Sequence, residues 1–177
     1  RIAFAPLAYV KPVSAVAIFA GAFLGRHAGF LVGALSALLS NAFFGQGSWT
    51  PWQMYAWGLV GYLGGLLATF TSTHPTSSAN QAVLPDEKTH KLPPFLLMIW
   101  AFISGPFFGF VMNVYFIIGF VHPLTIESAL LAFAASIPFD LTHGVATLVF
   151  LVLLWLSWQK SVNRILTKYN LTGRSFR

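Results

Sequence analysis

The sequence predicts an all-α, polytopic membrane protein, a bundle of six transmembrane helices whose first helix is truncated. Of its 177 residues, 56% are hydrophobic and 8% are charged, whereas a soluble domain has about 25% charged residues. The mean hydropathy is +0.73, and long apolar runs recur along the chain. This composition excludes a water-soluble globule and a disordered chain.

The charge and the cysteine content exclude further classes of protein. The net charge of +6 comes from ten Lys and Arg against four acids, and these cations are scattered singly instead of forming the basic face of a nucleic-acid-binding protein. The chain has no Cys, so a disulfide scaffold, thiol catalysis and a cysteine metal site are excluded.

The helices follow from the length of the apolar runs, because a hydrocarbon core of about 30 Å needs about 20 apolar residues per helix. Prolines open the first, fourth and fifth runs, and glycines close the first and second, as at many helix ends. The runs are residues 12–25 (a short span), 28–45, 52–71, 93–120 and 138–158.

Two further segments complete the prediction of one integral membrane domain over residues 1–177. Residues 1–10 are expected to be the end of a sixth helix whose beginning is missing. Residues 125–135 are short and amphipathic, and we expect a surface or re-entrant helix there. An even number of helices places both termini on the same side of the membrane.

The positions of the cations predict the orientation, because Lys and Arg in short loops are retained in the cytoplasm. One face would carry Arg26, Lys88, Lys91, Lys160, Arg164, Lys168, Arg174 and Arg177, and the other Arg1 and Lys11. The first face is therefore predicted to be cytoplasmic, with residues 72–91 as a loop and 159–177 as a tail on that side.

Small residues four positions apart predict close helix packing, because lipid offers no hydrophobic drive for helix association. They are Ala17, Gly21 and Gly25, then Gly29 with Gly33, Gly61 with Gly65, and Gly105 with Gly109. Packing within the chain is the favoured interpretation, and docking onto a separate subunit is the alternative.

Polar residues inside apolar spans are costly and therefore informative. Asn41, Asn113, Asp140 and His143 all lie toward the predicted outer ends of their helices. The connection between residues 45 and 52 lies on the same side, so we predict one outward-facing pocket.

That connection supplies two indoles and two amides next to two glycines: Gln46, Trp49, Trp52 and Gln53 beside Gly45 and Gly47. One interpretation is an aromatic belt at headgroup depth, with Thr50 capping a helix that starts at Pro51. The other, slightly favoured, is a ligand lid that grips a flat polar ring by stacking and amide hydrogen bonds.

Asp140 and His143 lie three residues apart and so share one helix face. In a structural interpretation Asp140 lies in the first turn of the last helix, after Ser136 as a possible cap, and His143 is its partner. In the functional interpretation both bind the polar edge of a ligand. No metal site and no cofactor are predicted. Lys11 either extends to the headgroups or contacts an anionic ligand group.

Two stretches of the sequence are distinctive. The first reads GFLVGALSALLSN from Gly29 and continues through FFGQGSWTPWQM, and the second is IPFDLTHG from Ile137. Both resemble the substrate-binding S components of energy-coupling-factor (ECF) vitamin transporters. The likeness covers nearly the whole chain and is most specific around Trp49. The family's docking motif, Ala-x-x-x-Ala in the first helix, has no matching position.

The resemblance implies a non-enzymatic, six-helix protein of the bacterial plasma membrane, with cytoplasmic termini, that binds a vitamin from outside. It would associate with a transmembrane coupling (T) subunit and two cytoplasmic ATPase subunits, and topple within the bilayer to deliver its ligand. The pocket would be lined by Phe4, Tyr9 and Lys11, the Trp49 loop, Asn113, Asp140 and His143.

The motif around Trp49 looks most like a cobalamin-linked branch of this family, so cobalamin (vitamin B12) is the expected ligand. A mouth lined by Trp, Gln and Asn also suits a large, amide-rich molecule. Riboflavin or another vitamin is the first alternative. An intramembrane enzyme using Asp140 and His143, and a purely structural or channel-forming bundle, are the alternatives from other classes.

Overall fold

The computed structural model describes residues 10–71 and 92–169, and these residues are all-α. The helices are α1 (Val13–Leu24), α2 (Arg26–Phe44), α3 (Trp49–Phe70), α4 (Phe95–Phe120) and α5 (Ile126–Lys168). The helix predicted in residues 1–10 lies outside the described residues, except for Val10. Phe4, Tyr9 and the loop predicted at residues 72–91 lie outside them as well.

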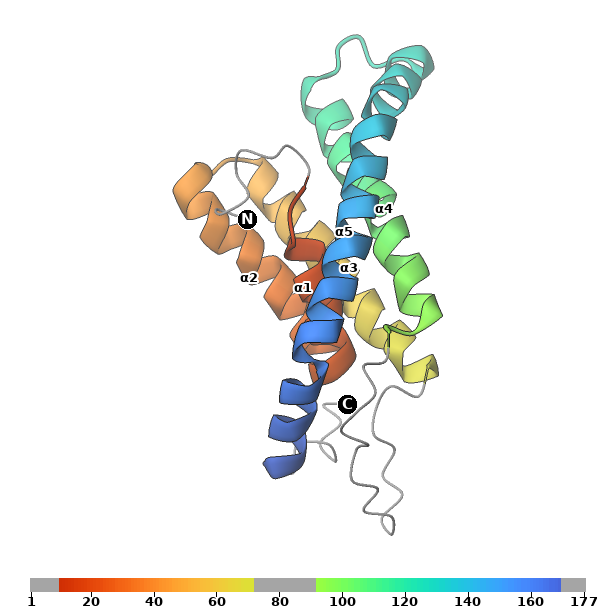
Figure 1. Ribbon diagram of the computed structural model, residues 1–177. Coiled ribbons are helices and arrows are strands. Elements are labelled where there is room, and N and C mark those ends of the chain that lie inside the picture. The colour runs from red at the N-terminus through yellow and green to blue at the C-terminus, as the bar shows by residue number, and fades with distance from the viewer. Residues whose placement is uncertain (1–9, 72–91, 170–177) are drawn as a thin grey trace.

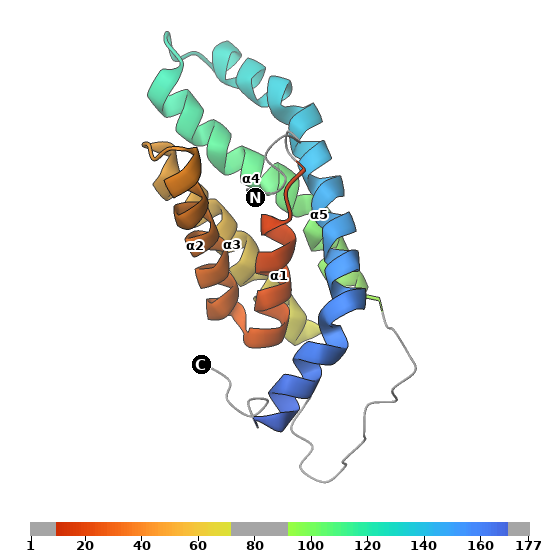
Figure 2. The ribbon, with the colours of Figure 1, turned by 60° about the vertical axis from the view of Figure 1, so that its left-hand side comes forward.

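The five helices form two packed groups (Figures 1 and 2). The shorter helices α1, α2 and α3 pack closely against one another, and α4 and α5 form a long antiparallel hairpin beside them. The start of α1, the α2–α3 connection and the α4–α5 connection lie toward one end of the bundle, hereafter the mouth end. The start of α2 and the end of α5 lie toward the opposite end.

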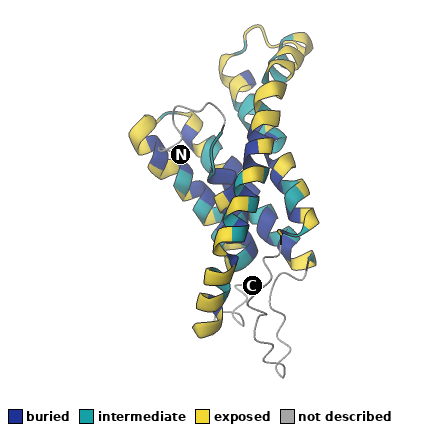
Figure 3. Ribbon diagram, viewed as in Figure 1, coloured by how far each residue is buried: buried dark blue, intermediate teal, exposed yellow. Residues whose placement is uncertain are grey.

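The core runs along the contacts among α1, α3, α4 and α5, while most outward-facing positions remain exposed (Figure 3). Its largest fully buried side chains include Ile18, Val60, Leu97 and Leu151. Many exposed residues are also large and apolar, such as Phe43, Phe95 and Ile126. A bundle that is apolar inside and outside suits lipid and not water.

Three of the described helices, α2, α4 and α5, are long and apolar enough to cross a membrane. With 12 residues, α1 is a shorter apolar helix, about 18 Å long at 1.5 Å per residue. The predicted spans at residues 28–45 and 93–120 thus coincide with α2 and α4, and the short span at 12–25 with α1. The chain is a multi-pass membrane protein.

The last helix differs from its prediction. Residues 125–135 are not a separate surface or re-entrant helix, because α5 is one helix of 43 residues that begins at Ile126 and continues through Pro138. It also continues to Lys168, into the predicted tail. Proline is tolerated within membrane helices more readily than within soluble ones.

Glycines bring the backbones of α1, α2 and α3 into contact. A Cβ on Gly61 would overlap the carbonyl oxygen of Gly29, and one on Gly33 would overlap that of Trp57. A Cβ on Gly21 would likewise overlap the carbonyl oxygen of Gly61. The small-residue spacing therefore serves packing within the chain at these positions, the interpretation that the sequence favoured.

Candidate functional site

One buried polar contact joins the first and last described helices. The Ser14 hydroxyl of α1 and Nε2 of His143 on α5 form a hydrogen bond at 3.0 Å, and both residues are buried. Which atom donates depends on the imidazole tautomer. The structural interpretation of the sequence predicted Asp140 as the partner of His143, whereas Nε2 of His143 bonds to Ser14.

A second polar cluster joins the end of α2 to the first turns of α3. Nδ2 of Asn41 lies 2.9 Å from Oγ1 of Thr50 and 2.9 Å from Oε1 of Gln53, and it donates to both. Asn41 is 1% exposed, so this amide is committed to holding the two helices together. The bond to Oε1 also fixes the orientation of the Gln53 amide.

The α2–α3 connection differs from the predicted helix cap. The helix begins at Trp49, two residues earlier than expected, and Ser48 at its N-cap makes no side-chain capping bond. Thr50 lies inside the helix and accepts from Asn41. Gln46 donates to the carbonyl of Leu38 at 3.1 Å, which closes the connection over the end of α2.

A third cluster links α4 and α5. Nδ2 of Asn113 donates to the Ser136 hydroxyl at 2.7 Å, and that hydroxyl donates to Oδ2 of Asp140 at 2.8 Å. Gly109 makes room for this carboxyl, because a Cβ there would overlap its atoms. Since α5 begins at Ile126, Asp140 is not in a first helical turn and Ser136 is not a cap. The prediction that a helix N-terminus stabilises Asp140 is wrong.

Aromatic rings connect these clusters. Trp57 of α3 stacks on Phe108 of α4 with centroids 4.6 Å apart, and Phe108 meets the His143 ring edge-on at 5.2 Å. Nearer the mouth end, Tyr115 lies 5.8 Å from Trp52 between ring centroids, and its hydroxyl is 2.7 Å from that of Ser48.

The predicted site residues thus divide into groups around one aromatic layer, which we define as Trp57, Phe108 and His143. Asn41 follows Ala37 by one helical turn and Gln53 precedes Trp57 by one, and both Ala37 and Trp57 belong to a small core cluster against which Phe108 packs. Lys11 is half-buried just before the start of α1. Asn41, Gln53 and Asn113 lie on the mouth side of this layer, because α2 ends, α3 begins and α4 ends toward the mouth.

Some predicted residues are less central. Trp49 is 38% exposed, and Gln46 is exposed at the α2–α3 connection. A cavity of about 400 Å³ lies elsewhere, between α2 and α3, and none of the predicted residues line it. Within residues 10–71 and 92–169, no three His, Asp or Glu side chains are grouped as metal ligands would be.

Sequence reasoning missed several residues that join the clusters: Ser14, Trp57, Phe108 and Tyr115. Ser14 is a hydroxyl inside an apolar span, the same signal that drew attention to Asn41 and Asn113. The aromatic residues carried no such signal, because 16% of the chain is Phe, Trp or Tyr. Only the packing of the helices distinguishes them.

Together, the apolar helices and the polar groups packed between them define a multi-pass membrane protein with hydrogen-bonding side chains inside its bundle. The family of ECF-type riboflavin transporter S components matches residues 1–160, and the chain belongs to this family. It is therefore a transport subunit and not an enzyme. No significantly similar curated protein or solved structure was found.

Family membership also implies association with a T component and ATPases in the membrane. The description of the family names riboflavin, which agrees with the alternative ligand from the sequence and gives no support to a cobalamin-specific branch.

Proposed function

We propose that this protein is the high-affinity vitamin-binding subunit of an ATP-driven uptake system and that its vitamin is riboflavin. The observation that carries the proposal is the gathering of amide, hydroxyl, carboxyl and imidazole groups around stacked aromatic rings near one end of an apolar bundle. The family match supports riboflavin in place of the cobalamin expected from the loop motif.

The chemistry of riboflavin suits these groups. Its isoalloxazine is a flat ring system with a uracil-like edge of carbonyl acceptors and an N–H donor, and its ribityl chain carries hydroxyls. Aromatic side chains such as Trp52 and Tyr115 can stack on the rings, while Asn and Gln amides can both donate and accept along the edge. Gln53 and Asn113, with Asp140, supply such groups from three helices.

The hydrogen bonds already present support a pre-organised site. Asn41 holds Gln53, and Ser136 holds Asp140, in single orientations. A ligand that meets fixed polar groups loses less affinity to side-chain ordering than one that must order them itself. We therefore expect tight binding without large rearrangement of α2, α3, α4 or α5.

The site is proposed to face the outside of a bacterial plasma membrane, with both termini in the cytoplasm. The start of α2 at Arg26 and the end of α5 at Lys168 lie at the end opposite the mouth, which agrees with retention of cations in the cytoplasm. The T subunit and two ATPase subunits would complete the transporter and supply the energy from ATP.

Ligand titrations of the detergent-purified protein test the proposal. Riboflavin is expected to raise the melting temperature and cobalamin is not, because a ligand at 1,000 times its Kd stabilises by about 4 kcal/mol. Stabilisation by cobalamin alone would reject riboflavin and retain the transport role. Stabilisation by neither, nor by thiamine, folate or pantothenate, would reject vitamin binding.

Matched tryptophan variants test the location of the site. Trp52→Ala is expected to weaken riboflavin binding by about 1–3 kcal/mol, the contribution of a well-packed aromatic anchor. Trp158→Ala is the control, because Trp158 is 59% exposed and lies near the far end of α5. Quenching of riboflavin fluorescence gives the affinities, and equal affinities for both variants would place the ligand elsewhere.

A further inference from the structure

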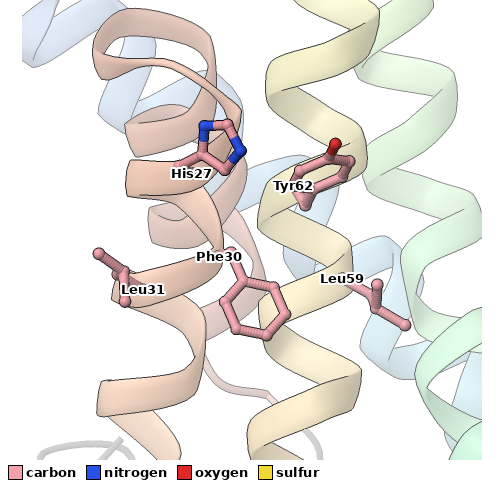
Figure 4. Close-up of a pocket in the computed structure, with 5 residues that line it drawn as sticks. All are labelled: His27, Phe30, Leu31, Leu59 and Tyr62. Carbon is pink, nitrogen blue, oxygen red and sulfur yellow. The ribbon is translucent and has the colours of Figure 1, made fainter. Parts of the chain in front are cut away.

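A groove on the outside of the bundle lies between α2 and α3, away from the polar clusters. It has a volume of about 400 Å³ and is lined by His27, Phe30, Leu31, Leu59 and Tyr62 (Figure 4). Leu31 is 57% exposed, whereas Phe30 and Leu59 are half-buried. The groove therefore opens toward the surroundings of the protein and not toward its core.

The groove exists because α2 and α3 approach backbone to backbone. Gly58 lies directly beneath the Phe30 ring, and a Cβ there would come within 2.7–3.0 Å of ring atoms. The Phe30 ring also meets Tyr55 edge-on, with centroids 6.1 Å apart. Phe30 is thereby held against α3, and an apolar channel remains beside it along the seam of the two helices.

One end of the groove is basic. The guanidinium of Arg26 lies 5.6 Å from the centroid of the Tyr62 ring, and the His27 ring lies 5.8 Å from the same centroid. The backbone of Arg26 packs against Gly65, which fixes this cation at the start of α2. His27 and Tyr62 face each other at that end of the groove (Figure 4).

No described carboxylate neutralises this end. The acidic residues within the described ranges are Glu127 and Asp140, and both lie in the half of α5 nearer the mouth, whereas Arg26 begins α2 at the opposite end. An apolar channel that ends at a cation and an imidazole is complementary to a molecule with a hydrocarbon chain and an anionic head.

We propose that this groove binds one anionic phospholipid, with an acyl chain against Phe30, Leu31 and Leu59 and the phosphate on Arg26 and His27. Guanidinium groups bind phosphate through charge-assisted hydrogen bonds, and basic pockets between transmembrane helices bind anionic headgroups. A hydrocarbon chain suits this groove, because three of its five lining residues are Phe or Leu.

Native mass spectrometry of the detergent-purified full chain tests the site with two lipids of identical chains, phosphatidylglycerol and phosphatidylcholine. The wild type is expected to retain phosphatidylglycerol preferentially. Arg26→Gln should weaken phosphatidylglycerol retention about five-fold, the effect of one juxtamembrane cation, and leave phosphatidylcholine unchanged. Leu59→Trp fills the channel and should lower retention of both lipids.

Matched controls are Arg164→Gln, which removes another cation near the same end, and Leu153→Trp, which enlarges an exposed leucine on α5. Neither should change lipid retention. Equal losses in Arg26→Gln and Arg164→Gln, equal retention of the two lipids by the wild type, or displacement of the lipid by inorganic phosphate would each overturn the proposal. So would variants that keep their lipid but fail to assemble with the T subunit, because a protein would then occupy the groove.

Discussion

The two halves of the molecule associate in different ways. Helices α1, α2 and α3 meet through backbone contacts at glycines, with no side chain between Gly61 and Gly29. Between α4 and α5 the backbones touch at Gly105 and Gly144, but toward the mouth end polar side chains intervene. One half is held mainly by close approach and the other partly by hydrogen bonds.

This difference shows how a membrane protein can combine a fixed scaffold with a polar site. In lipid, helices gain little from burying apolar side chains, so close packing and interhelical hydrogen bonds must hold them together. Where two helix backbones touch, no space remains between them for a solute. The seam with Asn113, Ser136 and Asp140 provides both cohesion and groups that can bind a solute.

The largest effect is expected where two backbones touch. Gly61→Ala places a methyl group on the carbonyl oxygen of Gly29, and neither backbone can move aside without separating α2 from α3. We expect a loss of about 3 kcal/mol in the free energy of unfolding, measured by denaturation in detergent micelles.

Gly119→Ala is the matched control in α4, because nothing lies within 4 Å of a Cβ added there. It should be neutral or stabilise by about 0.5–1 kcal/mol through higher helix propensity. If both variants lost equal stability, the backbone contacts of the first three helices would not be what holds them together.

Within the hairpin of α4 and α5, smaller losses of stability are expected, and they should differ between a backbone contact and a side-chain contact. A methyl group added at Gly105 would overlap the backbone of Asp140 and Gly144, whereas the three atoms nearest to one added at Gly109 all belong to the Asp140 carboxyl. A side chain can rotate away, so Gly109→Ala should cost about 1–2 kcal/mol through the lost bond to Ser136, and Gly105→Ala more. The melting temperatures of the two variants give the order, and the reverse order would contradict this account.

The start of α5 should contribute about 1 kcal/mol through its cap. Thr125 accepts from the backbone N–H of Ser128 at 3.1 Å, and Ser128 accepts from that of Thr125 at 3.0 Å. Thr125→Ala should increase hydrogen exchange in the first turn of α5 and leave exchange near Leu151 unchanged. A global increase would show that this turn supports the whole hairpin.

The smallest expected effect is a gain in the free energy of unfolding. Nε2 of Gln159 is buried, and no described residue offers it a hydrogen-bond partner. Gln159→Leu should therefore stabilise by up to about 1 kcal/mol, because an unpaired buried amide is costly. Gln53→Leu is the control and should destabilise, since its Oε1 accepts from Asn41. Thermal denaturation of both variants measures the difference in sign.

Hydropathy and small-residue spacing were sufficient to predict the all-α membrane fold, because lipid imposes apolar runs and close packing directly on the sequence. They failed at Pro138, which was taken as the start of a helix. A proline that opens a helix and one tolerated within it look alike in sequence, and only the course of the chain in three dimensions distinguishes them.

The candidate site was predictable in its polar residues but not in their pairing. Asn41, Asn113, Asp140 and His143 were conspicuous because each interrupts an apolar run. Their partners depend on which helices are neighbours, and the link from His143 to Ser14 crosses 129 positions of sequence. No local pattern encodes a contact over that distance.

The link between Ser14 and His143 also has a consequence for assembly. Ser14 is the second residue of α1, which begins at Val13, so no carbonyl lies one turn back in its own helix to replace the imidazole. If α1 and α5 part within the bilayer, both polar groups lose this partner in hydrocarbon. Because synthesis proceeds from the N-terminus, Ser14 is made first, and its bond can form only when the last described helix has been inserted.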